Sequence, residues 1–193
     1  ETSGLDYATL TAHKIGGPKG IGLLYVRDGS RFFPLISGGG QERNLRAGTE
    51  NIAFACAFAE SLEWFSSHRE KLNQQWKGFK MMMLQKLQEL EVFFLVGDPE
   101  SGLANTMNLG FQGISAESLL ICLDLDEIAV STGSACSSGA MEASHVLLAM
   151  GYSHQEAKSS LRISMGWNTS EEDIIQLTER LIHHVHRLNA LYS

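Results

Sequence analysis

The spacing of hydrophobic residues divides the chain into a strand-rich beginning and a remainder of helices and strands. Residues 5–12 and 21–26 carry short apolar runs, and the glycines and proline between them predict a tight connection between two strands. An alanine-rich apolar segment at 53–65 predicts a helix. A second stripe runs from Leu72 to Leu90 in alternating steps of three and four, which predicts a long amphipathic helix between two domains.

A Ser/Thr-x-x-Glu spacing at two positions predicts helix starts. Ser67 and Glu70 are expected to form a capping box for the long helix, and Thr169 and Glu172 to form one for a last helix. The buried stripe of that last helix is predicted at Ile174, Leu177, Leu181, Val185 and Leu188.

The region between these two helices alternates between strand and helix patterns. The predicted strands cover residues 92–96, 106–111, 128–130 and 162–166. The predicted helices cover residues 115–125, capped by Ser115, and 141–150, ended by Gly151. Strands that alternate with helices indicate an α/β fold.

The composition narrows the classes of partner. Hydrophobic residues make up 44% of the sequence and charged residues 19%, as in an ordinary globular protein. The net charge of -7 disfavours a broad basic surface for nucleic acid or for an anionic membrane. No stretch approaches the ~18 apolar residues of a membrane span, and no basic segment followed by an apolar one opens the sequence. We expect small-molecule or protein partners and a cytoplasmic protein.

The three cysteines lie in two kinds of surroundings. Cys136 lies among small and polar residues between Ser134 and Gly139, where a thiol is hard to bury, and this context favours a reactive thiol over an inert exposed one. Cys56 and Cys122 lie in apolar runs and are predicted on packed helix faces. An odd number without a Cys-x-x-Cys spacing argues against a disulfide framework and indicates a reducing compartment.

A lysine at a predicted strand end is the second candidate for chemistry. Lys14 follows His13 and precedes the glycine-rich turn at 16–20, which can hold its amine rigidly. A deprotonated lysine amine bonds to the carbonyl group of a cofactor. A lone lysine in a glycine-rich turn is more often structural, so this assignment depends on the other motifs.

Five segments follow one another in a compatible order. They are Thr11–Lys14, Gly38–Arg43, Arg46–Asn51, Ser131–Gly139 and Leu161–Ser164. This series resembles the second half of a cysteine desulfurase of the NifS type, in the class V aminotransferase group of pyridoxal-phosphate enzymes, and the resemblance covers essentially the whole chain. It implies the end of a mainly parallel cofactor domain of fold type I at 1–70. It also implies a smaller C-terminal α/β domain at 71–193 that carries the catalytic-cysteine loop.

The resemblance implies four residues that bind the cofactor. Lys14 would attach covalently to pyridoxal 5'-phosphate, and Thr11 and His13 would bind its phosphate. Thr49 would reach the phosphate of the neighbouring subunit, which implies a homodimer. Hydroxyl and imidazole groups suit an oxygen-rich dianion.

For the substrate, the resemblance implies two further residues. Arg162 would hold the carboxylate of L-cysteine, and Cys136 would be the nucleophile that takes its sulfur. The products would be L-alanine and a persulfide on Cys136, whose outer sulfur passes to an acceptor such as an iron–sulfur scaffold protein. No metal site is expected.

The sequence departs from the family pattern in two ways. The family's aspartate at the pyridine nitrogen, its stacked histidine and its phosphate-binding turn lie upstream of the lysine strand, and only 13 residues precede Lys14 here. Asp6 aligns with a strand residue and is not the pyridine partner. Trp167 stands where many relatives carry arginine. We therefore expect a fragment of a longer enzyme, inactive without its other half.

Two other functions stay open from sequence. A selenocysteine lyase shares the scaffold, although the Ser137–Gly139 continuation resembles desulfurases more closely. A non-catalytic dimerisation or scaffold module is the alternative if the natural chain begins at Glu1.

Several polar residues receive structural interpretations. His183, His184 and His186 are predicted on flanking or exposed faces of the last helix rather than around a metal. Arg43 and Arg46 are expected to form salt bridges at a surface or interface. For Asn105 and Asn108, bonding to the backbone in a turn is expected, with ligand contact as the alternative.

Overall fold

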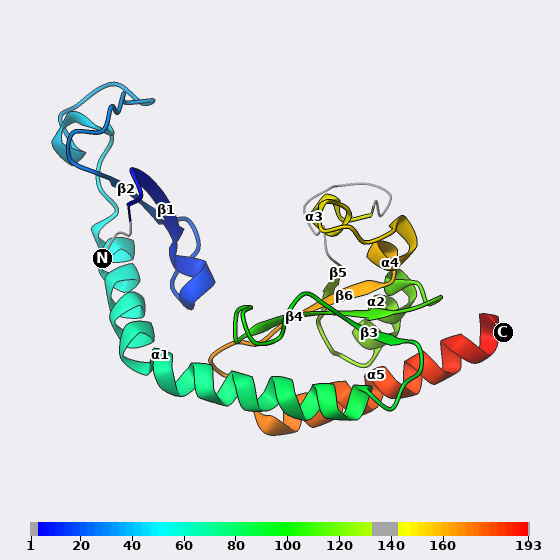
Figure 1. Ribbon diagram of the computed structural model, residues 1–193. Helices are drawn as coiled ribbons and strands as arrows, with labels where there is room; N and C mark the ends of the chain where they lie inside the picture. Colours follow the sequence, from blue (N-terminus) through cyan, green and yellow to red (C-terminus); the bar gives the residue numbers. More distant parts are fainter. Residues whose placement is uncertain (1–3, 133–142, 193) are drawn as a thin grey trace. The chain divides into compact units, whose positions relative to one another are not determined.

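The computed structural model describes residues 4–132 and 143–192. The chain divides into two compact units, Glu1–Glu70 and Lys71–Ser193. The α-helices and β-strands of both units are labelled in Figure 1.

The first unit is built on a β-hairpin. Strands β1 (Tyr7–Thr11) and β2 (Gly22–Val26) pair antiparallel, with Tyr7 opposite Val26 and Thr11 opposite Gly22. A Cβ atom at Gly22 would lie 2.9 Å from the carbonyl oxygen of Leu10, so the pairing at this position requires glycine. Both predicted strands are confirmed.

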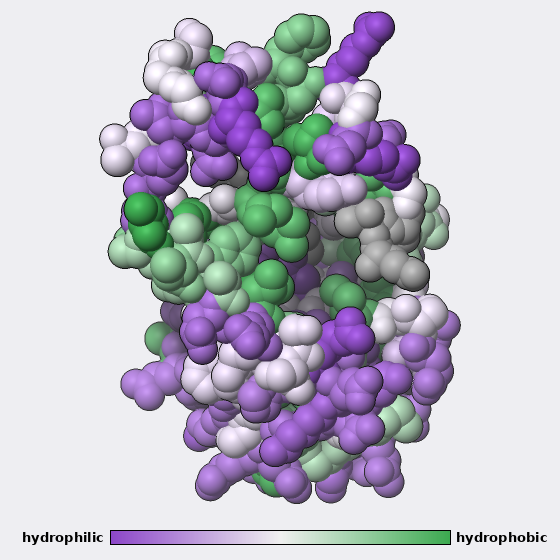
Figure 2. Space-filling view, turned by 90° about the vertical axis from the view of Figure 1, so that its left-hand side faces the viewer, coloured by the Kyte–Doolittle hydropathy of each residue, from purple (hydrophilic) through white to green (hydrophobic). Residues whose placement is uncertain are grey.

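The connection within the hairpin and the long segment after it bury few side chains. A short helical turn, η1 (Ala12–Ile15), follows β1, and another, η2 (Glu42–Asn44), lies in the long segment before α1. Apolar side chains remain exposed here, Phe33 at 82% and Leu35 at 97%. Figure 2 shows hydrophobic side chains reaching the surface on the face that it views.

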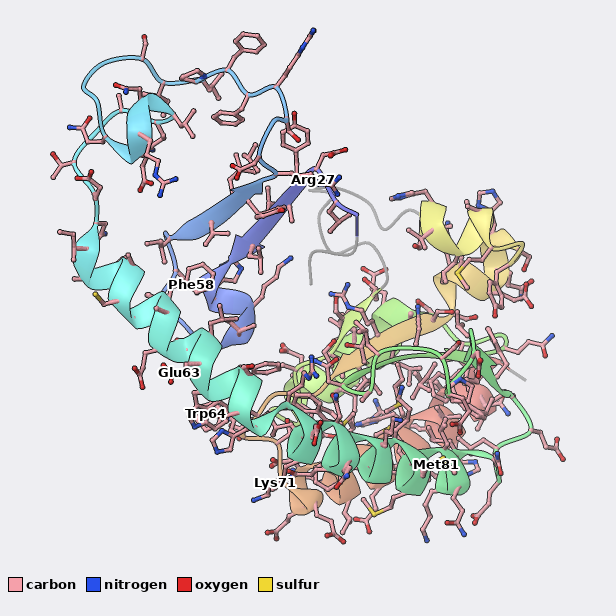
Figure 3. All side chains as sticks on the ribbon, turned by 60° about the vertical axis from the view of Figure 1, so that its left-hand side comes forward. Arg27, Phe58, Glu63, Trp64, Lys71 and Met81 are labelled. Atoms are coloured by element: carbon pink, nitrogen blue, oxygen red, sulfur yellow. The ribbon has the colours of Figure 1, made fainter. Side chains whose placement is uncertain are left out.

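Helix α1 (Ile52–Leu87) is one continuous helix, and the boundary between the two units falls within it. The predicted new start at Ser67 is therefore wrong. The hydroxyl of Ser67 instead donates to the carbonyl of Trp64 at 2.8 Å, a local bond that lets serine sit inside a helix. Figure 3 labels Phe58, which is buried, and Met81, which is 58% exposed, on this helix.

The second unit contains a four-stranded sheet in the order β3-β4-β6-β5. Its strands are β3 (Phe93–Val96), β4 (Thr106–Phe111), β5 (Ser131–Thr132) and β6 (Ser160–Ser164). Strand β4 has the predicted bounds, β6 begins two residues early, and residues 128–130 are not a strand. The α/β class is confirmed, and each strand pair among the described residues is antiparallel.

Helices complete the second unit. They are α2 (Ala116–Leu125), α3 (His145–Ala149), α4 (His154–Lys158) and α5 (Glu171–Tyr192). The end of α1 and α5 lie along the same side of the sheet (Figure 1). The predicted stripe of α5 is confirmed, since all five of its residues are buried. The indole N–H of Trp76 on α1 donates to the carbonyl of Gly166 at 3.0 Å and joins this helix to the end of β6.

The predicted cap of α2 is confirmed, but that of α5 is displaced by one residue. Ser115 Oγ accepts the N–H of Ser118. At α5, Ser170 and Asp173 each accept the other's backbone N–H, at 2.8 and 3.2 Å. Thr169 Oγ1 instead accepts the N–H of Gly166. The Thr169–Glu172 and Ser170–Asp173 pairs both fit the broader Ser/Thr-x-x-Asp/Glu spacing, so the sequence alone did not separate them.

Two interpretations of single side chains are wrong. Cys122 is buried as predicted, but Cys56 is exposed, because its part of α1 has little packed against it. His184 is only 5% exposed rather than on a solvated face. Its Nε2 lies 2.7 Å from Oδ2 of Asp126, at the end of α2. A hydrogen-bond partner distant in sequence therefore allows this imidazole to be buried. His183 and His186 are exposed as expected.

No helix in the described part of the chain is long and apolar enough to cross a membrane.

The pairing of His184 with Asp126 makes a testable contribution to stability. The hydrogen bond from His184, followed by the charge of Arg180, lowers the pKa of Asp126 below the usual 3.8. A carboxyl whose pKa is lowered by folding stabilises the protein above its ordinary value, and this stabilisation is lost as the pH falls through the folded pKa. Asp126→Asn should therefore lower the free energy of unfolding near neutral pH, by a difference that shrinks in acid.

The measurement is urea unfolding of both proteins at about pH 7 and at about pH 3. Asp124→Asn, at an exposed position two residues earlier, is the matched control for loss of charge. An equal deficit at both pH values would contradict the pairing.

Candidate active site

The turn after β1 gathers three of the predicted site residues. Thr11 ends the strand, and Ala12–Ile15 form η1, so His13 and Lys14 follow within one turn. Thr11 Oγ1 and His13 Nδ1 lie 2.7 Å apart in a hydrogen bond. The side chains of His13 and Lys14 are exposed, whereas Ala12 between them and the strand is fully buried. The turn therefore presents a hydroxyl, an imidazole and an amine, while the buried Ala12 holds its backbone in place.

Close packing of the following residues against α1 holds this turn in place. Gly16 ends η1 with φ +79°, and the N–H of Gly17 donates to the carbonyl of Ala12 at 2.9 Å. A Cβ atom at Gly17 would lie 2.9 Å from the Cβ of Ala12 and 3.0 Å from the hydroxyl of Ser61 on α1. Only glycine allows this approach without displacing its neighbours.

Thr49 follows a loop with unusual backbone geometry. Glu42, Arg43 and Asn44 all have positive φ, at 48°, 57° and 64°, a conformation that side chains disfavour. Across the loop, the side-chain carbonyl of Gln41 accepts the N–H of Gly48 at 3.1 Å, immediately before Thr49. Thr49 is exposed. The glutamine bond ties the two ends of this loop together.

Arg46 bonds to the backbone of its own loop. Arg46 Nη1 donates to the carbonyl of Ala47, and Ala47 is buried. For Arg43 and Arg46, salt bridging at a surface or interface stays a prediction.

Arg162 lies on the polar face of the sheet in the second unit. In β6, Leu161 and Ile163 are buried, whereas Arg162 between them is exposed. Its cross-strand neighbours are Asn108 on β4 and Ser131 on β5. Arg162 Nη2 donates to Ser131 Oγ at 3.4 Å. Ser131 belonged to a sequence motif, but its contact with Arg162 follows only from strand register and was missed by sequence reasoning.

Cys136 lies outside the described residues. Strand β5 ends at Thr132, four positions before it along the chain.

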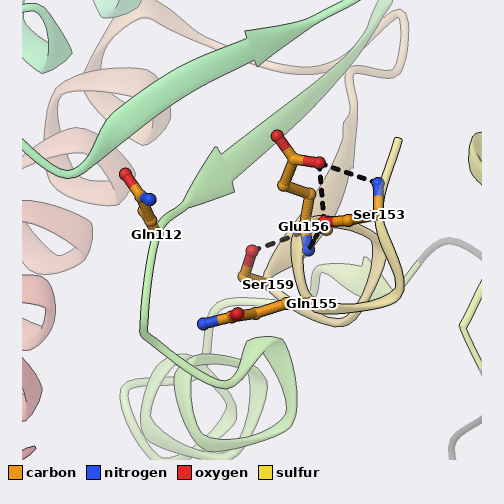
Figure 4. A pocket seen from close by; sticks show the side chains of 5 residues that line it. All are labelled: Gln112, Ser153, Gln155, Glu156 and Ser159. Carbon is orange, nitrogen blue, oxygen red and sulfur yellow. Dashed lines mark hydrogen bonds between the residues drawn. The ribbon is translucent and has the colours of Figure 1, made fainter. Parts of the chain in front are cut away.

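A pocket that sequence reasoning did not predict lies near α4. It is a pocket of about 250 Å³ lined by Gln112, Ser153, Gln155, Glu156 and Ser159 (Figure 4). Its polar groups already serve the helix start, since Glu156 accepts from the backbone N–H and the hydroxyl of Ser153, each at 2.7 Å. These bonds lower the pKa of Glu156 and hold it as a capping carboxylate rather than a proton donor.

Within residues 4–132 and 143–192, no group of three or more His, Cys, Asp or Glu side chains could hold a metal ion.

Comparison with known proteins identifies the family. The aminotransferase class-V model matches residues 1–177, so the chain belongs to the aminotransferase class-V family.

Curated relatives in this family carry desulfurase names. The chain is 37% identical over 191 residues to cysteine desulfurase IscS 1 of Archaeoglobus fulgidus, covering 99% of this chain and 50% of that protein. It is 40% identical to cysteine desulfurase 2 of Trichormus variabilis, covering 99% of this chain and 48% of that protein. The chain thus spans about half the length of the relatives it matches.

Solved structures show the same relationship. A NifS-like protein superposes with a TM-score of 0.86 at 31% identity, over 96% of this chain and 47% of that one. A NifS-like protein from Rickettsia africae gives 0.84 at 32% identity, over 95% and 48%. The α/β architecture is therefore that of part of a NifS-like protein.

The fixed turn predicts opposite effects for two glycine-to-alanine changes. Gly17→Ala should lower the free energy of unfolding by about 1–3 kcal/mol, because the new methyl group meets Ala12 and Ser61. Gly78→Ala, in α1 with nothing within 4 Å of the added atom, should raise it by about 0.5–1 kcal/mol. Chemical denaturation of the two variants measures both signs, and a neutral Gly17→Ala would show that the turn is loosely held.

Proposed function

We propose that this sequence is part of a pyridoxal-phosphate-dependent cysteine desulfurase. The enzyme removes sulfur from L-cysteine, giving L-alanine and a persulfide on Cys136 that supplies iron–sulfur cluster assembly or another sulfur transfer. The observation that carries the proposal is the Thr11–His13 hydrogen bond directly beside the exposed Lys14 at a strand end. Desulfurase-named relatives aligned over 99% of the chain support it.

The residues of the β1 turn fit pyridoxal phosphate. The hydroxyl and the imidazole would suit the phosphate of this cofactor, and the amine of Lys14 would suit its aldehyde. When bound, this cofactor withdraws electrons from the α-carbon of an amino acid. In the proposal Thr11 and His13 bind the phosphate, while Lys14 carries the cofactor and moves a proton at the substrate α-carbon.

Arg162 and Cys136 act on the substrate in this proposal. Arg162 holds the carboxylate of L-cysteine through two parallel N–H···O bonds. The Cys136 thiolate attacks the substrate sulfur, so that an S–S bond forms as the C–S bond breaks. The electron pair of that bond returns to the carbon skeleton, which takes up a proton and leaves as L-alanine.

The partners are also proposals. Thr49 reaches the phosphate of a neighbouring subunit, in a homodimer whose sulfur passes to an acceptor protein. L-cysteine as the ligand is supported by a neighbour of 31% identity and TM-score 0.61, described as SspA in complex with cysteine. A cytoplasmic location fits the free Cys56 and Cys122.

Lys14 is tested by loss of the bound cofactor. In the complete natural protein, Lys14→Ala should abolish both the visible absorption band of the cofactor and desulfuration, since the amine that anchors it is gone. Lys19→Ala, in the following turn, is the control and should keep both. A band that survives Lys14→Ala and disappears in Lys19→Ala would reverse the assignment.

Cys136 is tested by mapping the transferred sulfur. Cys136→Ser should keep the cofactor and still bind L-cysteine, but lose the persulfide and almost all alanine production, because a serine hydroxyl is far less ionised than a thiol near neutral pH. Alkylation followed by mass spectrometry locates the extra sulfur. A persulfide on Cys56 or Cys122 would contradict the proposal. Residual activity of Cys136→Ser on selenocysteine would not, because selenium is a better leaving group than sulfur.

A further inference from the structure

Asn108 carries an acceptor that the fold leaves unused. Its side-chain oxygen Oδ1 is buried and has no hydrogen-bond partner among the described residues. A buried carbonyl without a donor has lost its water without any compensation, so such atoms are uncommon and call for an explanation.

The strand register gives Asn108 a specific neighbour. It lies directly opposite Arg162, and Ser131 lies opposite Arg162 on the other side. Directly paired residues of antiparallel strands point to the same face of a sheet, with Cβ atoms about 4.5–5.5 Å apart. Asn108, Arg162 and Ser131 therefore form one row of polar side chains across three strands.

The guanidinium of Arg162 has more N–H donors than a carboxylate ligand requires, so it can also donate to Asn108 Oδ1. A guanidinium carries five N–H groups, and two of them suffice to hold a carboxylate as a fork. Within the described part of the chain, Arg162 makes one long side-chain bond, 3.4 Å to Ser131 Oγ. Donors remain on the guanidinium, while a desolvated acceptor lies in the adjacent strand.

Asn105 shows what the same residue type does in a purely structural role. It lies three positions earlier, just before β4, and its Nδ2 donates to the carbonyl of Met165 at 3.5 Å. Asn105 thus bonds to the backbone as expected from sequence, and Asn108 Oδ1 does not.

We propose that Asn108 is a positioning residue for Arg162: its Oδ1 accepts an N–H of the guanidinium when Arg162 holds the substrate carboxylate, with Ser131 on the opposite side. Two acceptors in flanking strands orient the plane of the guanidinium. Because Oδ1 is already dehydrated, forming this bond requires no further loss of water from it. The inference rests on the proposed function of Arg162 and adds the residue that orients it.

The test separates orientation from structural support. In the complete natural protein with its cofactor, we compare Asn108→Leu with Asn105→Leu as the matched control. Asn108→Leu should unfold at an equal or higher urea concentration than the unchanged protein, because it removes an unsatisfied acceptor. Its KM for L-cysteine should rise about tenfold, the scale of one hydrogen bond to a charged group. Asn105→Leu should show the opposite pattern, with stability lost and KM unchanged.

A ligand without a carboxylate gives a second readout. Binding of cysteamine, followed by the absorption change of the cofactor, should be the same in Asn108→Leu as in the unchanged protein, while binding of L-cysteine weakens. If Asn108→Leu folds poorly, Asn108→Asp serves instead. Its new carboxylate faces Arg162 across the strands and should weaken L-cysteine binding by competition, again sparing cysteamine.

The variant Arg162→Lys shows whether a negative result concerns the role of Asn108 alone or also the proposed role of Arg162. If this variant weakens L-cysteine binding and neither change at Asn108 does, the inference is wrong and the proposed role of Arg162 stands. If Arg162→Lys also binds L-cysteine normally, the carboxylate is held elsewhere and both are overturned. Equal weakening of L-cysteine and cysteamine by Asn108→Leu would likewise reject a role at the carboxylate.

Discussion

The burial of Leu161 and Ile163 on either side of Arg162 is the constraint on which the second unit depends. Both apolar side chains are almost completely buried, so the residue between them must face the other side of the sheet. A slip of one residue in the register of β6 would bury a guanidinium and expose two apolar side chains. The fold therefore holds the orientation of Arg162 with the free energy of its hydrophobic core.

The β1 turn likewise combines buried residues that fix the backbone with accessible polar residues beside them. Ala12 is fully buried and Gly17 closes on it, while Thr11, His13 and Lys14 remain accessible. In both units, small or apolar residues fix the backbone and the polar residues between them stay available for chemistry. Packing of this kind is what holds reactive groups within the narrow tolerances that catalysis needs.

Sequence patterns predicted the elements that depend on local periodicity and failed where distant partners decide. The stripe of α5 and strand β4 needed only the spacing of apolar residues. The burial of His184 depends on Asp126, 58 positions away. The predicted start at Ser67 failed for a local reason, because the Ser-x-x-Glu spacing also occurs inside a continuous helix, where the Ser67 hydroxyl donates to the carbonyl of Trp64. Motif order predicted Arg162, but its neighbours follow only from strand pairing.

Asn105 and Asn108 show why a candidate site cannot be completed from residue type alone. They are identical side chains three positions apart in one segment, and both suit a turn. Asn105 precedes β4 and bonds to the backbone beyond β6, whereas Asn108 lies within β4 and faces Arg162 across the strand pair. A partly satisfied polar row inside a sheet is unfavourable for folding, and real proteins keep such exceptions mainly at functional positions. The unsatisfied oxygen of Asn108 is the observation on which its proposed role beside Arg162 rests.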